Sequence, residues 1–257
     1  MKTERMPVIF IGHGSPMNAI EDNEFSRTWV EIRKALPRPK AILSISAHWE
    51  TLKPQVTAMQ TPKTIHDFYG FPDELNEMQY PAPGSPELAA RVMGLLADDE
   101  ITPDQAWGLD HGTWSVLARM FPDASVPVVQ LSLPRTREGR IHFDLGSKLL
   151  PLRDEGVLIL GSGNVVHNLA RIRWEGEPFD WAIEFDRKVK EAIEADEPER
   201  LIRFQEQGAA AAISINSAEH YLPLLYVLGA RQRDDTCTFY CESVAYGSLS
   251  MRCIRFG

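Results

Sequence analysis

Five of the seven histidines lie in short segments of unusual composition, where predicted strands or helices meet loops. The segments are Gly-His-Gly-Ser-Pro around His13, Ser-Ala-His-Trp around His48, Asp-His-Gly around His111, Gly-Ser-Gly-Asn-Val-Val-His-Asn with His167, and Ala-Glu-His-Tyr-Leu-Pro with His220. Imidazole is the commonest protein ligand for zinc and similar metals, and it titrates near neutral pH. Histidines that converge at the strand ends of an α/β protein therefore predict an enzyme built around a metal ion.

Two of these histidines directly follow predicted strands. Residues 7–12 form a continuous apolar run that ends at a glycine, and residues 41–47 form a second run of this kind, as expected for strands buried on both faces. His13 and His48 come next in the chain, and the glycine loop 161–164 that precedes His167 follows a third strand. Sites in open α/β sheets form beyond the carboxyl ends of the strands, so we expect these side chains to converge.

Buried strands alternate with amphipathic helices along the rest of the chain. Further strands are predicted over residues 55–59, 126–133 and 156–160, and two closing strands, expected to be antiparallel, over 236–242 and 248–256. Helices are predicted over residues 21–36, 85–96, 113–120, 140–152, 181–195, 198–204 and 218–228. This alternation predicts a single α/β domain across residues 1–257, with a mostly parallel central sheet flanked by helices. Residues 61–84 are expected to form a long ordered loop that covers the site.

The histidines also have plainer interpretations. A lone histidine between Gly12 and Gly14 more often serves in a turn, but the matched placement of His48 favours half of a metal site. His220 lies near the start of an apolar helix, where a hydrogen bond to the backbone is the alternative to metal ligation. Its neighbour Glu219 is another candidate ligand, although adjacent helical positions point about 100° apart and one metal would seldom use both.

The remaining histidines carry weaker signals. The glycine loop before His167 matches neither a dinucleotide-binding loop nor a Walker loop, so we interpret it as holding His167 close to bound substrate. His111, beside Asp110, is open to acid–base duty or to a structural hydrogen bond. His66 lies in the covering loop, where the aromatic residues around it would line a pocket for a planar ring or form a satellite hydrophobic cluster. His142 is expected to be an exposed structural residue within a helix.

Composition and charge disfavour several other classes of protein. The net charge is −9, from 27 basic and 36 acidic residues, which argues against binding nucleic acid or an anionic membrane, because both need a basic surface. No apolar run is long enough to span a bilayer, and the few cysteines, Cys237, Cys241 and Cys253, predict a reduced cytoplasmic protein. The motifs Gly-x-Ser-x-Gly, His-Glu-x-x-His and Cys-x-x-Cys do not occur, which disfavours serine hydrolases and the common zinc proteases.

An ordered series of motifs spans nearly the whole chain. It comprises Gly-His-Gly-Ser-Pro-Met-Asn at 12–18, Ser-Ala-His-Trp at 46–49, Thr-Ile-His-Asp-Phe at 64–68, Tyr-Pro-Ala-Pro-Gly at 80–84, Asp-His-Gly at 110–112, Gly-Asn-Val-Val-His-Asn at 163–168 and Glu-His-Tyr-Leu-Pro-Leu at 219–224. The series resembles the class III extradiol ring-cleavage dioxygenases, and most closely their 4,5-DOPA dioxygenase-like branch. The resemblance implies a single catalytic α/β domain, one divalent metal per chain, and a small aromatic diol as substrate together with O₂. It also implies insertion of both oxygen atoms beside the two hydroxyls, with a muconic semialdehyde as product.

The resemblance further implies roles for individual residues. His13, His48 and His220 match the three metal-ligand positions. His167 matches the acid–base histidine close to the metal, and His111 matches a second catalytic histidine of the active site.

At the third ligand position this sequence departs from the better-known protocatechuate branch of the family. That branch has glutamate there, whereas this chain has His220 with Glu219 beside it. A site of neutral imidazoles suits Zn²⁺ as well as Fe²⁺, and zinc binds more tightly at a given site. We therefore expect Fe²⁺ to support turnover, and the purified protein to carry Zn²⁺ on His13, His48, His167 and His220.

Two other functions stay open at this point. A zinc-dependent hydrolase would use a metal-activated hydroxide with His167 or Glu219 as base, and a non-catalytic metal- or ligand-binding protein would keep the pocket without turnover. The complete set of histidines favours the dioxygenase. The sequence assigns no Arg or Lys to a substrate carboxylate, and it carries no signal for the oligomeric state.

Overall fold

Apolar residues along the first strand alternate between two hydrophobic layers. In the computed structural model, which describes residues 5–257, strand β1 (Val8–Gly12) is buried along its whole length. Val8 and Phe10 pack into one cluster of buried side chains, whereas Ile9 and Ile11 pack into another. Successive side chains of a strand point to opposite faces of its sheet, so the two clusters cover the two faces. The first strand is therefore central.

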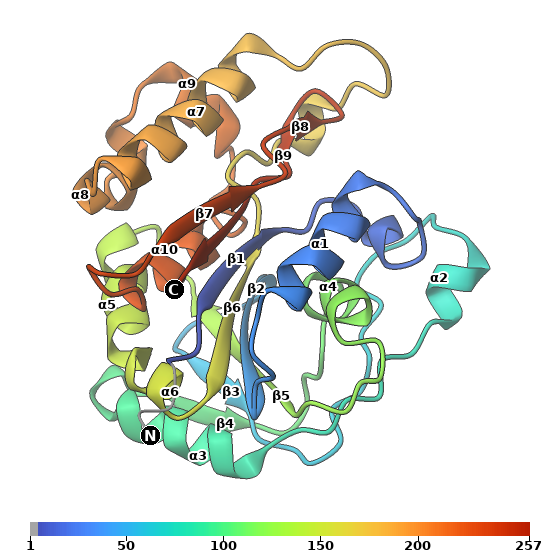
Figure 1. Ribbon diagram of the computed structural model, residues 1–257, viewed down its shortest axis with the longest axis vertical. Coiled ribbons are helices and arrows are strands. Elements are labelled where there is room, and N and C mark those ends of the chain that lie inside the picture. The colour runs from blue at the N-terminus through green and yellow to red at the C-terminus, as the bar shows by residue number, and fades with distance from the viewer. Residues whose placement is uncertain (1–4) are drawn as a thin grey trace.

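The main sheet contains strands from both ends of the chain. Its strands in the described part are β1, β2 (Ala41–Thr51), β3 (Gln55–Thr57), β4 (Thr102–Asp104), β5 (Val128–Pro134), β6 (Val157–Gly163), β7 (Cys237–Tyr240) and β10 (Cys253–Phe256). They lie in the order β4-β3-β5-β2-β6-β1-β10-β7 (Figure 1). The central strands β5, β2, β6 and β1 run parallel, and β3 pairs parallel with β4, while β3–β5, β1–β10 and β10–β7 are antiparallel. The parallel centre and the antiparallel C-terminal strands confirm the expected fold class.

Helices cover both faces of this sheet, as Figure 1 shows. One face carries α1 (Glu24–Lys34) and α4 (His111–Met120), and the other carries α3 (Pro86–Leu95), α5 (Gly139–Leu149), α7 (Asp180–Glu194) and α10 (Leu222–Gly229). Shorter elements complete the described chain: α2 (Asp73–Glu77), α6 (Pro151–Asp154), α8 (Pro198–Ile202), α9 (Ala209–Ser214), the 3-10 helices η1 (Pro16–Ala19), η2 (Ala97–Asp99), η3 (Leu169–Arg171) and η4 (Phe204–Glu206), and the hairpin of β8 (Val244–Ala245) and β9 (Leu249–Ser250). None of the helices in residues 5–257 combines the length and the apolarity needed to cross a bilayer.

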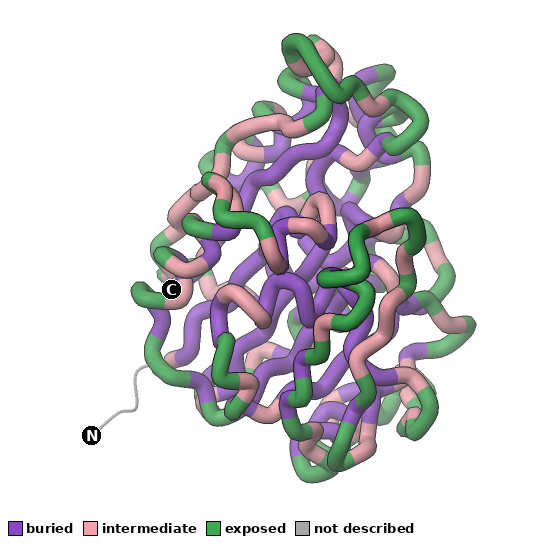
Figure 2. Tube along the Cα trace, turned by 90° about the vertical axis from the view of Figure 1, so that its right-hand side faces the viewer, coloured by how far each residue is buried: buried purple, intermediate pink, exposed green. Residues whose placement is uncertain are grey.

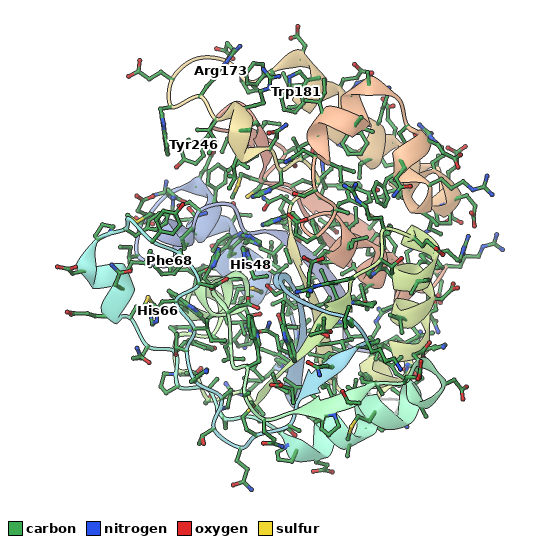
Figure 3. All side chains as sticks on the ribbon, turned by 180° about the vertical axis from the view of Figure 1, so that it is seen from behind. His48, His66, Phe68, Arg173, Trp181 and Tyr246 are labelled. Atoms are coloured by element: carbon green, nitrogen blue, oxygen red, sulfur yellow. The ribbon has the colours of Figure 1, made fainter. Side chains whose placement is uncertain are left out.

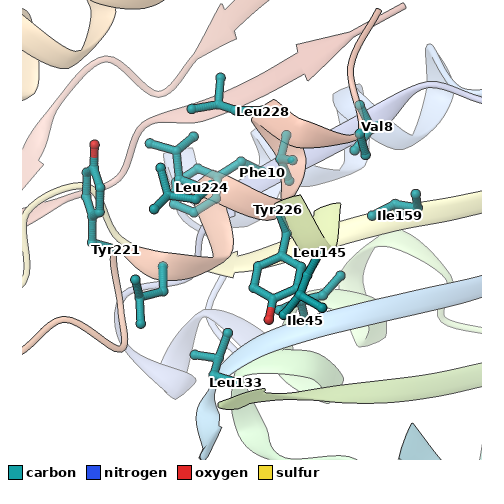
Figure 4. Close-up of a cluster of buried hydrophobic side chains, with 14 of the residues drawn as sticks. Val8, Phe10, Ile45, Leu133, Leu145, Ile159, Tyr221, Leu224, Tyr226 and Leu228 are labelled. Carbon is teal, nitrogen blue, oxygen red and sulfur yellow. The ribbon is translucent and has the colours of Figure 1, made fainter. Parts of the chain in front are cut away.

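Helix α10 is the centre of the larger hydrophobic layer. All of its residues are buried, as expected for a helix that is apolar on every side. Leu224, Tyr226 and Leu228 pack with β1 and α5 side chains (Figure 4), and Figure 2 shows the buried trace running through the middle of the molecule. Truncating a buried leucine such as Leu224 to alanine costs about 2–5 kcal/mol of folding free energy. This layer fixes the start of α10 against the sheet.

Two glycines of β6 allow that close approach. A Cβ atom on Gly161 would lie 2.7 Å from the carbonyl oxygen of Pro223, and one on Gly163 would collide with the carbonyl oxygen of His220. Both glycines belong to β6, so the expected glycine loop at 161–164 is largely strand. The glycines serve the packing of the strand against the start of α10.

Several predicted elements differ from the structure at their ends. The strand predicted over 41–47 continues as β2 to Thr51, because Glu50 and Thr51 pair with β5 after a register shift. The helix predicted over 140–152 divides at Pro151 into α5 and α6, since proline cannot donate the next helical hydrogen bond. The helix predicted from Ser85 is confirmed: Ser85 Oγ accepts a hydrogen bond from the Leu88 amide at 3.1 Å.

The expected exposure of His142 is wrong. Its side chain is fully buried between α5 and α10, with its ring edge-on to that of Tyr226 at 5.6 Å. Nε2 donates a hydrogen bond to the carbonyl oxygen of Thr136 at 3.0 Å. Burial lowers the pKa of His142 to about 4, so the imidazole is neutral at pH 7. The helical pattern of residues 140–152 did not reveal that this polar position faces α10.

Candidate active site

Parallel strands bring His13 and His48 together at one edge of the sheet. His13 follows β1 directly, and His48 lies in the last part of β2. Strand β6 lies between β1 and β2, with Gly12 opposite Gly163 and Ser46 opposite Ser162. The Nε2 atoms of His13 and His48 are 3.2 Å apart. The predicted convergence of these two side chains is present in the structure.

His220 completes a cluster of three imidazoles. It precedes α10, and its carbonyl oxygen accepts a hydrogen bond from the Asn164 amide at 2.8 Å, which ties it to the end of β6. One ring nitrogen from each of His13, His48 and His220 lies within 4.8 Å of the others. The close approach at Gly163 is therefore what places the third histidine.

A buried serine determines which nitrogen of His13 carries the proton. Ser162 Oγ donates its own hydrogen to the carbonyl oxygen of Gly112, so it can only accept from Nδ1 of His13, at 3.0 Å. The proton of this neutral imidazole is then on Nδ1. The lone pair of Nε2 is left facing His48.

Carboxylates play the same part for the other two imidazoles. Nδ1 of His220 donates to Glu219 Oε1 at 3.1 Å, and Nδ1 of His48 lies 3.2 Å from Asp67 Oδ2. A carboxylate at one ring nitrogen orients a histidine and makes its other nitrogen a better metal ligand. Glu219 therefore lies behind His220 as an orienting group.

This donor set fits a divalent metal. When each ring carries its single proton on Nδ1, the three lone pairs face one another and repel, and a shared cation removes the repulsion while using all three. Each ring also has the hydrogen-bond acceptor that metal-bound histidines normally have. Burial lowers the pKa of His13 and His220 well below the usual value, which keeps these ligands neutral at pH 7.

His111 is held by a carboxylate from the covering loop. Asp67 Oδ1 accepts a hydrogen bond from the His111 amide at 2.9 Å and lies 3.0 Å from Nδ1 of His111. Burial opposes the charge on Asp67, but the contacts with His111 and His48 outweigh it and lower the pKa of this carboxyl. Asp67 thus bridges two site histidines.

Asp110, which precedes His111 in the chain, interacts with α4 and its neighbours and not with the His111 ring. Its Oδ1 accepts hydrogen bonds from the Thr113 amide at 3.2 Å and from Ser46 Oγ at 2.6 Å, which caps α4. Its Oδ2 accepts from the side-chain amide of Gln130. Asp110 places His111 through the helix rather than by direct contact with the ring.

His167 lies next to the three-histidine cluster. Its ring stacks on that of His220, with centroids 3.5 Å apart and planes within 3°. Its amide donates to the carbonyl oxygen of Ser214 at 3.0 Å. A ring nitrogen of His167 lies within 4.8 Å of a carboxylate oxygen of Glu219 and of a ring nitrogen of His220. Burial lowers the pKa of His167 to about 4, so it is neutral at pH 7.

A cavity of about 590 Å³ opens above these histidines. This volume is typical of small-molecule sites. His13, His48, His111, His167 and His220 all line it, and we call these five residues the floor. The apolar and aromatic walls include Phe68, Phe71, Leu169, Ile172 and Leu249. Figure 3 labels Phe68 and His48 at one level of the view and Tyr246 above them.

His66 lies behind this wall, outside the cavity lining. Its Nε2 is 2.8 Å from the carbonyl oxygen of Met78, and its ring packs against those of Phe68 and Trp114 at 5.7 and 5.5 Å. Of the two interpretations made from sequence, this placement matches the hydrophobic cluster beneath a loop. The next residue, Asp67, enters the site instead, and its place in the Thr-Ile-His-Asp-Phe motif was the signal that sequence reasoning overlooked.

Known proteins resemble this chain over nearly its whole length. Residues 7–253 match the family described as the catalytic LigB subunit of aromatic ring-opening dioxygenase. The chain is 48% identical to the 4,5-DOPA dioxygenase extradiol of Escherichia coli (strain K12), over 100% of this chain and 97% of that protein. It is 38% identical to the protein of the same name from Beta vulgaris, over 96% and 95% of the two chains. A crystal structure of an uncharacterized Escherichia coli K12 protein superimposes with a TM-score of 0.86 at 44% identity, covering 98% of this chain and 100% of the other.

Proposed function

Because the chain belongs to the family of aromatic ring-opening dioxygenases that includes the catalytic LigB subunit, we propose that it cleaves a DOPA-like catechol outside its two hydroxyls. The product of this reaction is a muconic semialdehyde. The observation that carries the proposal is the cluster of His13, His48 and His220, whose Nδ1 atoms each face an acceptor on the floor of an aromatic-walled cavity. The two relatives named 4,5-DOPA dioxygenase extradiol support a catechol of this kind.

His13, His48 and His220 are the residues that would hold the metal. When bound there, Fe²⁺ supplies the redox chemistry that lets O₂ react with an aromatic diol and acidifies the diol hydroxyls, whereas Zn²⁺ supplies only the second effect. Ser162, Asp67 and Glu219 hold the three rings in the orientation this requires.

His167 is the group best placed to move a proton. It lines the cavity and is neutral at pH 7, so a ring nitrogen can accept the proton that a catechol hydroxyl loses. Burial disfavours the resulting imidazolium, while the negative charge of Glu219 favours it. The protonated ring therefore gives up its proton readily to the opened product, and the stacking on His220 keeps it in place.

His111 and the walls complete the arrangement. Asp67 fixes the His111 ring at the cavity edge, where it can hydrogen-bond to the diol or to oxygen. Phe68, Phe71 and Leu169 offer apolar surface to the ring of the substrate and exclude water from the floor.

The first test is O₂ uptake by metal-stripped protein that is reloaded anaerobically with Fe²⁺ or with Zn²⁺ and given a panel of catechols that includes DOPA. We expect uptake with Fe²⁺ alone, coupled to a yellow ring-opened product. Turnover with Zn²⁺ and without O₂ uptake would indicate a hydrolase. No uptake by protein shown to contain iron would instead indicate a binding protein.

A further inference from the structure

The opening of the cavity displays large aromatic side chains to solvent. Tyr69, Trp174 and Tyr246 are 94%, 79% and 36% exposed, and all three line the same cavity. Trp174 and Tyr246 contact each other edge to face, with centroids 5.4 Å apart. Large aromatic residues gathered around a solvent-exposed opening mark a binding surface. We call these three residues and Glu21 the mouth.

Glu21 brings a negative charge to this aromatic group. It lines the cavity, and its side chain accepts a 3.3 Å hydrogen bond from the Asn23 amide group. It makes no ion pair with a Lys or Arg of residues 5–257. Glu21 and Tyr246 line the same cavity, and burial together with the charge of Glu21 raises the pKa of Tyr246. The mouth thus combines a carboxylate with aromatic faces.

Positive side chains are missing from the cavity wall in the part of the chain that the structure describes. Within residues 5–257, no Lys or Arg lines it. Arg119 is committed to the carbonyl oxygens of Asn18 and Glu21, at 3.0 and 2.7 Å. Arg173, labelled above Tyr246 in Figure 3, has its guanidinium 3.6 Å from the ring centroid of Phe179. A carboxylate on a substrate would therefore meet no Lys or Arg of the described residues on this wall.

The backbone of Tyr246 is strained. Tyr246 has a φ of +50°, in the left-handed region that bulky residues rarely adopt. Two hydrogen bonds secure the turn: Tyr246 accepts from the Arg173 amide at 2.9 Å, and Gly247 accepts from the Phe179 amide at 3.0 Å. The same bonds attach the turn to the segment that carries Trp174. Strain of this kind is commonly kept where a side chain has a functional position.

We propose that the mouth is a subsite for a cationic amine, so that the enzyme prefers catechols with an ammonium side chain to catechols with only a carboxylate. This inference rests on the proposed function, because the floor must bind the diol of the same molecule. An ammonium group gains from the Glu21 carboxylate and from the electron-rich faces of Trp174 and Tyr246. A carboxylate on the same side chain is repelled by Glu21 and is left to solvent. The inference goes beyond DOPA, which carries both groups, because it assigns recognition to the amine.

Binding without turnover tests the inference. Protein loaded anaerobically with Fe²⁺ is titrated calorimetrically with dopamine, with 4-ethylcatechol as its uncharged counterpart, and with 3-(3,4-dihydroxyphenyl)propionate as the acid. We expect dopamine to bind about fivefold more tightly than 4-ethylcatechol, and the acid to bind most weakly. Glu21→Gln should abolish the advantage of dopamine and leave the affinity for 4-ethylcatechol unchanged. Glu24→Gln, which removes the same charge from an exposed position outside the cavity lining, should keep the advantage.

The outcomes separate the two proposals. Equal binding of dopamine and 4-ethylcatechol, or an advantage that survives Glu21→Gln, would overturn the amine subsite and leave ring cleavage standing. Failure of all three catechols to bind would overturn both, because the floor would then not be a diol site.

Discussion

The floor and the mouth of the cavity are built from different kinds of structure. His13 on the floor is 1% exposed, whereas Trp174 at the mouth is 79% exposed. Most floor side chains come from strand ends and helix starts, and buried polar contacts hold the rings of His13, His111 and His220. Mouth side chains come from loops and a short hairpin. In such an arrangement the proposed reacting groups lie on rigid elements, whereas the residues proposed to select the substrate lie on loops, whose sequences vary more easily.

Removing a proposed metal ligand should have the largest effect on the floor. We expect His13→Ala to lose its bound metal and to lower turnover by more than about a hundredfold, because two imidazoles hold a metal far less tightly than three. Metal content by mass spectrometry and O₂ uptake measure the two effects. His66→Ala, outside the cavity lining, should retain both metal and activity. Full metal content in His13→Ala would remove this residue from the ligand set.

Replacing His167 should separate proton transfer from metal binding. We expect His167→Phe to keep the stack on His220 and the metal, but to lower kcat by about a hundredfold or more, the usual contribution of an acid–base group. Metal analysis is measured together with kcat. Loss of metal in this variant would instead make His167 a fourth ligand, as in the four-histidine zinc site expected from the sequence.

Asp67 belongs to the covering loop and contacts two histidines of the floor. Its replacement therefore tests whether the floor depends on this loop. Asp67→Asn keeps the shape but loses the charge shared by His48 and His111. We expect metal affinity or kcat to fall by about 10–100-fold, as for other carboxylates behind metal-bound histidines. Asp73→Asn, in α2 of the same segment, is the matched control. Unchanged metal binding and an unchanged pH profile would show that Asp67 only holds the loop.

A change at the mouth should have a smaller effect of a different kind. We expect Trp174→Ala to raise KM about threefold for an amine-bearing catechol and to leave kcat unchanged, because an exposed aromatic–cation contact is weak. Leu52→Ala removes an 84% exposed side chain elsewhere and should change neither constant. A fall in kcat would mean that the mouth also positions the reacting ring.

The smallest effect on activity is expected at His142, a buried histidine away from both regions. Its folded-state pKa of about 4 lies below the ordinary 6.5, so between these values the unfolded chain binds more protons. The free energy of unfolding therefore falls as the pH falls through this window, by about 2 kcal/mol from this residue at pH 5. His142→Gln should reduce the pH dependence of urea unfolding in metal-free protein. If the free energy of unfolding of His142→Gln fell with pH as steeply as that of the original protein, the low pKa of His142 would be contradicted.

Much of the floor could be predicted from the sequence because parallel strands have predictable ends. Apolar runs identified β1, most of β2 and β6, and the rule for open sheets then brought His13 and His48 together. The orienting partners were harder to predict. Ser162 acts through its position in the sheet, and Asp67 through a loop whose path depends on contacts distant in sequence.

The residues of the mouth could not be predicted from the sequence. Trp174 contacts Tyr246, whose backbone lies in the left-handed region of a turn. No periodic pattern in the sequence predicts such a turn. His142 shows the same limit in the core, because its burial depends on packing against Tyr226 of another helix. Local patterns predict elements, while side-chain partners arise from the tertiary fold.

The antiparallel pairing of β1 with β10 has a consequence for how the protein is made. Val8 pairs with Phe256 and Phe10 with Ile254, so the first strand must await a partner translated far later. Until β10 is made, one side of the apolar strand β1 has no hydrogen-bonding partner. Pairings between residues so distant in sequence form slowly. The proposed metal site beside β1 is therefore expected to form only after almost all of these residues have been translated. Chaperone binding to the nascent N-terminal strand would protect it during this interval.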